Sequence, residues 1–159
     1  MKHINVEIKA RCKNSDKIRT ILKQNNAECK GIDQQIDTYF IVPKGRLKLR
    51  EGNIENNLIH YLRDDKSGPK QSNVTLFKAD RNSNLKVTLS NALEILIVVK
   101  KKREIYFIEI EAIDEKDEFG KERLTRQCEQ YLKLFNIKED DLLKNSYSDM
   151  LLQKKSEKN

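Results

Sequence analysis

With 159 residues, the chain is long enough to bury one substantial hydrophobic core, and we expect a single domain. Charged residues make up 36% of the sequence, and 32 Lys and Arg against 25 Asp and Glu give a net charge of +7, which favours an anionic partner. Widely spaced cysteines argue against a disulfide framework or a zinc site, and the longest apolar run, residues 95–99, is too short to span a bilayer. Because no N-terminal segment resembles a signal peptide either, we expect a cytoplasmic protein with no membrane partner.

The first predicted strand, residues 2–12, carries charged side chains on one face. Successive side chains of a strand point to opposite sides, so Glu7, Lys9 and Arg11 lie together. Taken alone, such a strand is most often one with a solvent-exposed face. The same spacing recurs in residues 46–50, 61–63, 101–103 and 109–111. If these faces converge, they form a pocket rich in Lys and Arg with a few carboxylates, which suits a polyphosphate and its metal ions.

Capping and turn residues set the elements that follow the first strand. Asn14 or Ser15 is expected to cap a helix, and Gly31 is expected to end the connection before a strand over residues 34–42. The Pro-Lys-Gly turn of residues 43–45 then predicts a hairpin. Further strands are expected over residues 46–51, 58–63, 72–78, 94–107 and 108–113, with 94–107 forming either one long strand or a hairpin.

Three more helices are predicted in the second half of the chain. The helices are expected after a cap at Ser83 or Asn84, over residues 116–135, and around Leu142 and Leu143. Residues 153–159 are polar and charged and are expected to form a disordered tail. The predicted single domain therefore covers residues 1–152.

Seven short motifs follow one another in a recognisable order. They are Asn5-Val6-Glu7-Ile8-Lys9, Gln35-Ile36-Asp37-Thr38-Tyr39-Phe40, Gly45-Arg46-Leu47-Lys48-Leu49-Arg50-Glu51, Tyr61-Leu62-Arg63, Lys101-Lys102-Arg103-Glu104-Ile105-Tyr106, Glu109-Ile110-Glu111 and Ser146-Tyr147-Ser148-Asp149. In these motifs the chain resembles the CYTH superfamily, the triphosphate tunnel metalloenzymes, and most closely its class IV adenylyl cyclase-like branch. The resemblance implies an α+β fold with a mainly antiparallel closed β-barrel, or tunnel, that has a charged interior and flanking helices. Closure of the barrel would also remove exposed strand edges.

The resemblance also implies a site in which cations hold a triphosphate and carboxylates hold Mg²⁺ or Mn²⁺. The positions that match the family's triphosphate-binding cations are Lys9, Lys48, Arg50, Arg63, Lys101 and Arg103, and of these Lys9, Arg63, Lys101 and Arg103 are also expected to be catalytic. The positions that match its metal-binding carboxylates are Glu7, Glu109 and Glu111. Arg46 and Lys70 are further candidates at neighbouring positions. For any one of these cations taken alone, a solvated surface position is the alternative.

Two departures from the family pattern bear on activity. Asn5 replaces the first Glu of the signature, and an amide is a poorer ligand than a carboxylate, so one metal could bind weakly or be lost. The family also has a further strand, followed by a Gly-Leu-Gly turn, where Ile108 here runs directly into Glu109. Either the chain lacks this hairpin or the sequence omits a segment of the natural molecule, and the lack of turn residues favours the second.

We therefore expect a divalent-metal-dependent enzyme that acts on a nucleoside triphosphate or another triphosphate. It would be either adenylyl cyclase-like, converting ATP to cyclic AMP and pyrophosphate, or a triphosphate phosphohydrolase, because both reactions use the same cradle. The expected partner is a small-molecule triphosphate such as ATP, and the resemblance allows a homodimer. The alternative, suggested by Asn5 and the net charge, is a catalytically weak module that binds phosphorylated ligands or RNA. Nucleic acid is the less expected ligand because no aromatic stacking motif accompanies the charged strands.

Overall fold

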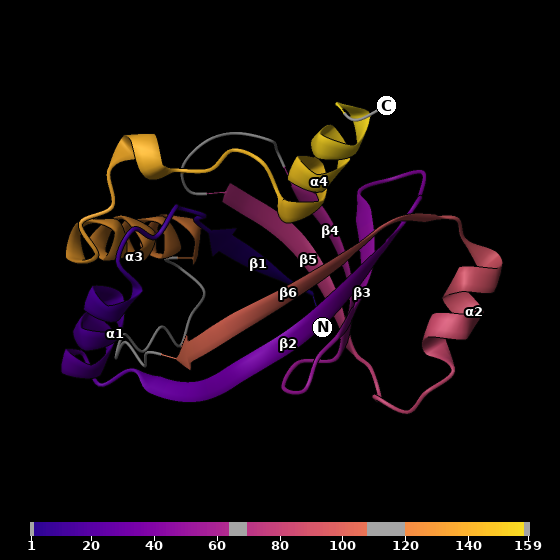
Figure 1. Cartoon of the computed structure of the whole chain (residues 1–159), viewed down its shortest axis with the longest axis horizontal. Helices are drawn as coiled ribbons and strands as arrows, with labels where there is room; N and C mark the ends of the chain where they lie inside the picture. The colour runs from indigo at the N-terminus through magenta and orange to yellow at the C-terminus, as the bar shows by residue number, and fades with distance from the viewer. Residues whose placement is uncertain (1, 64–69, 108–119, 158–159) are drawn as a thin grey trace.

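The structure of the chain, a computed structural model, describes residues 2–63, 70–107 and 120–157. Within these residues, six strands form one antiparallel sheet in the order β1-β5-β4-β3-β2-β6 (Figure 1). The strands are β1 (Lys2–Glu7), β2 (Glu28–Phe40), β3 (Arg46–Glu51), β4 (Asn57–Arg63), β5 (Lys70–Lys78) and β6 (Ile95–Phe107). The helices are α1 (Ser15–Gln24), α2 (Leu85–Ala92), α3 (Gly120–Leu134) and α4 (Tyr147–Ser156), with a 3-10 turn at Glu139–Asp141. The predicted α+β class with a mainly antiparallel sheet is confirmed.

The helices flank the sheet. Figure 1 shows α1 and α3 beyond one end of the strands and α2 beyond the other. Contacts join α3 to β1 and α4 to β6. Local capping explains where two helices begin: the Asn14 side chain accepts a hydrogen bond from the Lys17 amide before α1, and Ser146 and Asp149 form a capping box at the start of α4.

The predicted hairpin between β2 and β3 is confirmed, and a glycine fixes its turn. Gly45 has φ +73°, and a Cβ at this position would lie 2.8 Å from both the carbonyl oxygen of Tyr61 and the side chain of Leu62. Only glycine meets both requirements without strain. The turn therefore sets the register that places β3 between β2 and β4.

The prediction for the start of β2 was wrong. The strand begins at Glu28 rather than at residue 34 and pairs with β6 from Phe107 onward. Gly31 lies inside the strand, with φ +104° and a register shift beside it, so it forms a bulge rather than the end of a connection. A bulged glycine and a turn glycine have the same sequence signature.

Two further predictions need correction at the edge of the sheet. The first strand ends at Glu7 rather than at residue 12, and Ala10 instead forms an isolated bridge with Leu142. The amide of Leu143 donates to the carbonyl of Lys9 over 2.8 Å. The segment predicted as a short helix around Leu142 and Leu143 is thus an extended stretch that continues the sheet edge.

The C-terminal segment is more ordered than predicted. Helix α4 continues to Ser156, so residues 153–156, assigned above to a disordered tail, are helical. The predicted strand over residues 108–113, and with it the Ile108–Glu109 junction, lies outside the described residues. Within the part that the structure describes, β1 and β6 are the two edges of the sheet and no ladder joins them.

The hydrophobic core is small, and its two clusters lie on the inner face of the sheet, whereas Leu49, between the inward-facing Lys48 and Arg50, is buried on the other face. One cluster consists of Tyr39, Ile97 and Val99, against which Leu152 of α4 packs, and the other consists of Ile59, Tyr61 and Val74 with Leu76. Cluster residues from the same strand are two positions apart, such as Ile97 and Val99, as strand alternation requires. The same alternation carries the charged residues of β3 and β6 to this inner face.

Candidate triphosphate site

The inner face of the sheet and the start of α4 enclose a cavity of about 550 Å³. All six described strands or the residues directly after them contribute to its wall, so the sheet curls around it. This volume lies within the range of about 300 to 1,000 Å³ that is typical of small-molecule sites. The wall has a cationic part and an apolar part.

The cationic part contains five of the six residues predicted to bind triphosphate. They are Lys9, Lys48, Arg50, Lys101 and Arg103. Strand alternation explains which lysines of β6 reach the cavity: Lys101 faces inward, whereas its neighbours Lys100 and Lys102 are exposed. The sixth, Arg63, ends β4, and its side chain is not among those that the structure describes.

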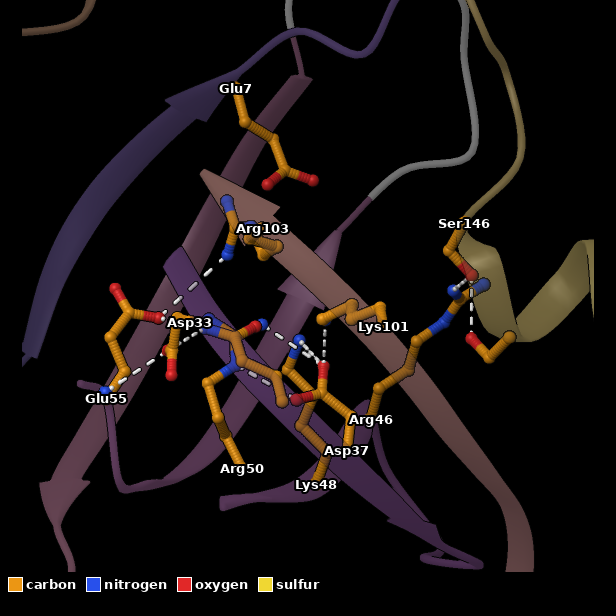
Figure 2. A network of polar contacts seen from close by, with 12 residues as sticks. Glu7, Asp33, Asp37, Arg46, Lys48, Arg50, Glu55, Lys101, Arg103 and Ser146 are labelled. Atoms are coloured by element: carbon orange, nitrogen blue, oxygen red, sulfur yellow. Dashed lines mark hydrogen bonds and ion pairs between the residues drawn. The ribbon is translucent and has the colours of Figure 1, made fainter. Parts of the chain in front are cut away.

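A buried carboxylate lies at the centre of these cations. Asp37 is fully buried, and Figure 2 shows Lys48, Arg50 and Lys101 converging on it. Its Oδ2 accepts from Lys101 Nζ over 2.5 Å and from Lys48 Nζ over 3.2 Å. Arg50 donates from Nε to Oδ1 over 2.9 Å and from Nη2 to Oδ2 over 3.1 Å. The three cations and this one carboxylate thus form a compact network.

The network and its burial shift the pKa values of its members. Burial opposes ionisation of Asp37, but the Arg50 hydrogen bonds and the positive charges of Lys48 and Lys101 outweigh it and hold the pKa of the carboxyl below its usual range. Burial and the charge of Arg50 lower the pKa of Lys48 to about 8, although Asp37 acts in the opposite sense. The same causes lower the pKa of Lys101.

A second acidic cluster supports the network from the β3–β4 loop. Glu55 accepts from Arg50 Nη1 over 2.8 Å and from Gln35 Nε2 over 2.9 Å, and Arg103 Nη1 lies 3.9 Å from it. Asp33 is also fully buried and accepts from Gln35 Nε2 and from two loop amides. Asp33, Gln35 and Asp37 alternate along β2 and so share its inner face.

Sequence reasoning missed Asp33, Gln35, Asp37 and Glu55 as site residues. A usable signal was the alternation of polar residues at positions 33, 35 and 37 of a long strand. Buried acids are rare unless they are paired, so an alternating acidic row next to cationic strands predicts an internal ion-pair network.

Aromatic rings flank the lysines. Lys48 Nζ lies 5.5 Å from the centroid of Tyr39 and 5.7 Å from that of Tyr61. The ring of Tyr147, at the start of α4, lies 5.8 Å from Lys9 Nζ and 6.0 Å from Lys101 Nζ. Ring faces attract cations at such distances, so the rings help to hold the ammonium groups in place.

Arg46 has a structural contact. It lies on the inner face of β3 and donates from Nη1 to the Asp149 carboxylate over 3.1 Å and to the Ser146 hydroxyl over 3.3 Å (Figure 2). These bonds attach the N-terminus of α4 to the sheet. Lys70, the other neighbouring candidate, begins β5, and its side chain is not among those that the structure describes.

The predicted metal ligands are only partly described. Glu7 lines the cavity, lies 3.5 Å from Lys9 Nζ, and points toward the side of the network where Arg103 lies (Figure 2). Glu109 and Glu111 lie outside the described residues. Within the residue ranges that the structure describes, no three or more His, Cys, Asp or Glu side chains lie together in a way that could hold a metal ion. Glu7 is therefore the one predicted metal ligand whose side chain the structure describes, and it is paired with Lys9.

Among the described helices, none is both long enough and apolar enough to cross a membrane.

Comparison with known proteins is consistent with this architecture. No curated protein resembles the chain closely enough to count as a match. A putative adenylate cyclase from Vibrio parahaemolyticus superimposes with a TM-score of 0.70 at 18% sequence identity, covering 94% of this chain and 97% of the other. A conserved hypothetical protein from Pyrococcus furiosus gives a TM-score of 0.67 at 20% identity, covering 94% and 99%, and the PH1012 protein from Pyrococcus horikoshii OT3 gives 0.65 at 20%, covering 94% and 98%.

These structural likenesses show the shared fold. The family assignment comes from the sequence, because the model of the CYTH domain matches residues 3–150, almost the whole chain. The chain therefore belongs to the CYTH domain family.

Proposed function

We propose that the protein is an enzyme that binds a triphosphate in this cavity and, with a divalent ion, either cyclises ATP or hydrolyses the triphosphate. The observation that supports the proposal most is the gathering of five predicted cations on one wall of a single cavity. Membership of the CYTH family, which includes adenylyl cyclases and triphosphatases, supports the same chemistry.

The cations supply binding and charge stabilisation. Lys48 and Lys101 each place an ammonium group at the cavity wall, and each group has three donors, of which Asp37 takes one. The side chain of Arg103 is 47% exposed, and within the part of the chain that the structure describes its ion-pair contact is a long one with Glu55, so we expect its guanidinium to be available to a phosphate. Such donors stabilise negative charge that develops on phosphate oxygens as a P–O bond breaks.

The apolar part of the wall suits an organic group attached to the phosphates. Ile59, Val74 and Leu76 line the cavity beside Tyr61. A bare phosphate chain would gain little from these side chains, whereas a base or another ring would bury apolar surface against them. The cavity composition therefore supports an organic triphosphate such as ATP.

A divalent ion would neutralise phosphate charge where Glu7 meets the cationic wall. The resemblance implies Mg²⁺ or Mn²⁺ at this place, with Glu109 and Glu111 as the other ligands. The residues described above bind and orient the phosphates whichever of the two ions is used.

Product analysis tests the proposal. The protein is incubated with ATP, thiamine triphosphate and tripolyphosphate, each with Mg²⁺ or Mn²⁺, and the products are resolved chromatographically. Cyclic AMP with pyrophosphate identifies a cyclase, and release of terminal phosphate identifies a phosphohydrolase. If tripolyphosphate binds but no substrate turns over, the protein is the catalytically weak binding module that Asn5 suggests, and the enzyme proposal fails.

A further inference from the structure

Asp37 has a role that the binding of phosphate by cations does not explain. It is a fully buried carboxylate that does not itself line the cavity but contacts three cations that do, and its charge opposes that of a bound phosphate. Removing a carboxylate from water costs several kcal/mol by the usual order of magnitude, so its presence needs a compensating benefit. Its contacts show what that benefit can be.

Counting donors separates the roles of the three cations. Arg50 has five N–H groups and uses two on Asp37 and one on Glu55, so most of them are committed. Lys48 and Lys101 each use one of three on Asp37. As far as the described residues go, two donors on each lysine therefore stay available for a phosphate, while the bond to Asp37 fixes the position of the ammonium group.

The charges around Lys48 and Lys101 also indicate that Asp37 keeps these lysines in place and protonated. Lys48, Arg50 and Lys101 repel one another, and this repulsion, like burial, favours loss of a proton from the lysines. The other charged and titratable groups facing the lysines are Arg103 on β6, Tyr39 on β2, Tyr61 on β4 and Tyr147 on α4. None of these is a carboxylate. Among the described residues, Asp37 is the carboxylate that contacts both lysines.

We propose that Asp37 is a positioning residue that keeps Lys48 and Lys101 protonated and fixed in the cavity before the phosphate chain binds. The inference rests on the proposed function, since it assumes that these lysines bind phosphate. A purely structural ion pair would affect only the stability of the fold. A positioning residue also sets the pH range over which the cavity binds an anion.

Asp37→Asn separates these two roles because it preserves the shape of the side chain and removes its charge. Loss of an opposite charge at this distance lowers a lysine pKa by about 1 to 3 units. The upper pH limit for binding inorganic tripolyphosphate should therefore fall by about one unit or more. Above that limit, each lysine that must be protonated costs about tenfold in affinity per pH unit.

The matched control is Asp33→Asn. It removes another fully buried carboxylate from the same face of β2, but one that contacts Gln35 and loop amides instead of the lysines. Calorimetric titration of the full chain with tripolyphosphate from pH 6 to 9.5, without divalent ions, compares both variants with the native chain. The ligand's own titration is common to all three proteins, so only differences between them count. The control should keep the native pH limit even if it is less stable.

A second measurement uses the native chain and does not depend on either variant folding. The ¹³Cε chemical shifts of Lys48 and Lys101, followed by NMR during a pH titration, should report charged ammonium groups at pH 7. Neutral lysines at pH 7, or an unchanged binding limit in a folded Asp37→Asn variant, overturns the inference. Failure of the native chain to bind tripolyphosphate contradicts the proposed function instead, and comparison of the lysine titrations in the native chain and in Asp37→Asn then tests whether Asp37 keeps the two ammonium groups charged.

Discussion

The two arginines of the cavity should respond very differently to truncation. Arg50 donates two hydrogen bonds to fully buried Asp37 and a third to Glu55, and its own side chain is 11% exposed. Breaking a buried ion pair costs about 3 to 5 kcal/mol, and because Lys48 and Lys101 remain on Asp37 we expect Arg50→Ala to lie near the lower end, about 3 kcal/mol. For a domain of this size that corresponds to a fall in Tm of about 6 to 12 °C.

Arg103→Ala should cost little stability. Its side chain is 47% exposed and its ion-pair contact with Glu55 is 3.9 Å long, so solvent screens the interaction and the cost should stay below about 1 kcal/mol. It should nevertheless weaken triphosphate binding by about 1.5 to 3 kcal/mol, the scale for hydrogen bonds to charged groups. Arg50→Ala should lose both binding and stability.

Urea unfolding and calorimetric titration of both variants measure the two effects. The control is Lys100→Ala, which removes the same charge from the exposed face of β6 and should change neither quantity strongly. If Arg50→Ala is as stable as this control, or if Arg103→Ala is the less stable of the two arginine variants, the network around Asp37 does not hold the site together.

Three further predictions follow from the same contacts. The pKa of Asp37 is lower in the folded chain than in the unfolded chain, so ionised Asp37 contributes stability above its unfolded pKa of about 3.9, and this contribution is lost as pH falls below that value. Urea unfolding between pH 5 and 3 should therefore show a steeper loss of stability for the native chain than for Asp37→Asn. Arg46→Ala removes the bonds that attach α4 to the sheet, so amide hydrogen exchange in α4 should accelerate about fivefold or more, corresponding to about 1 kcal/mol, while exchange in β4 stays unchanged. Asn5→Glu adds a carboxylate near Glu7, so the thermal shift caused by Mn²⁺ should grow and the metal-free protein should become less stable; an unchanged metal-induced shift would mean that Asn5 is remote from the metal.

The sequence predicted most of the fold because alternation and turn chemistry are local signals. The turn that joins β2 to β3 and the amphipathic pattern that predicts α3 both depend on residues close together in the sequence. Gly31 was misread because a bulge is defined by the partner strand, which sequence spacing does not reveal. The capping box of Ser146 and Asp149 could have been recognised, since both residues belong to the pattern of a helix start.

The site was only half predictable. The motifs identified the cations of β3 and β6, and alternation alone placed Lys48 and Lys101 on one face of their strands. They did not identify Asp37 as the residue that joins them, because its role depends on hydrogen bonds from three residues on two neighbouring strands. The burial that lowers the pKa of Lys48 likewise arises only when the sheet curls around the cavity.

The most direct test of the central claim is a crystal structure of the protein with tripolyphosphate bound. The account predicts phosphate oxygens within hydrogen-bond distance of Lys48, Lys101 and Arg103, while both lysines keep their hydrogen bonds to Asp37. Tripolyphosphate bound on the outer surface, with these three side chains pointing away from a common cavity, would contradict it.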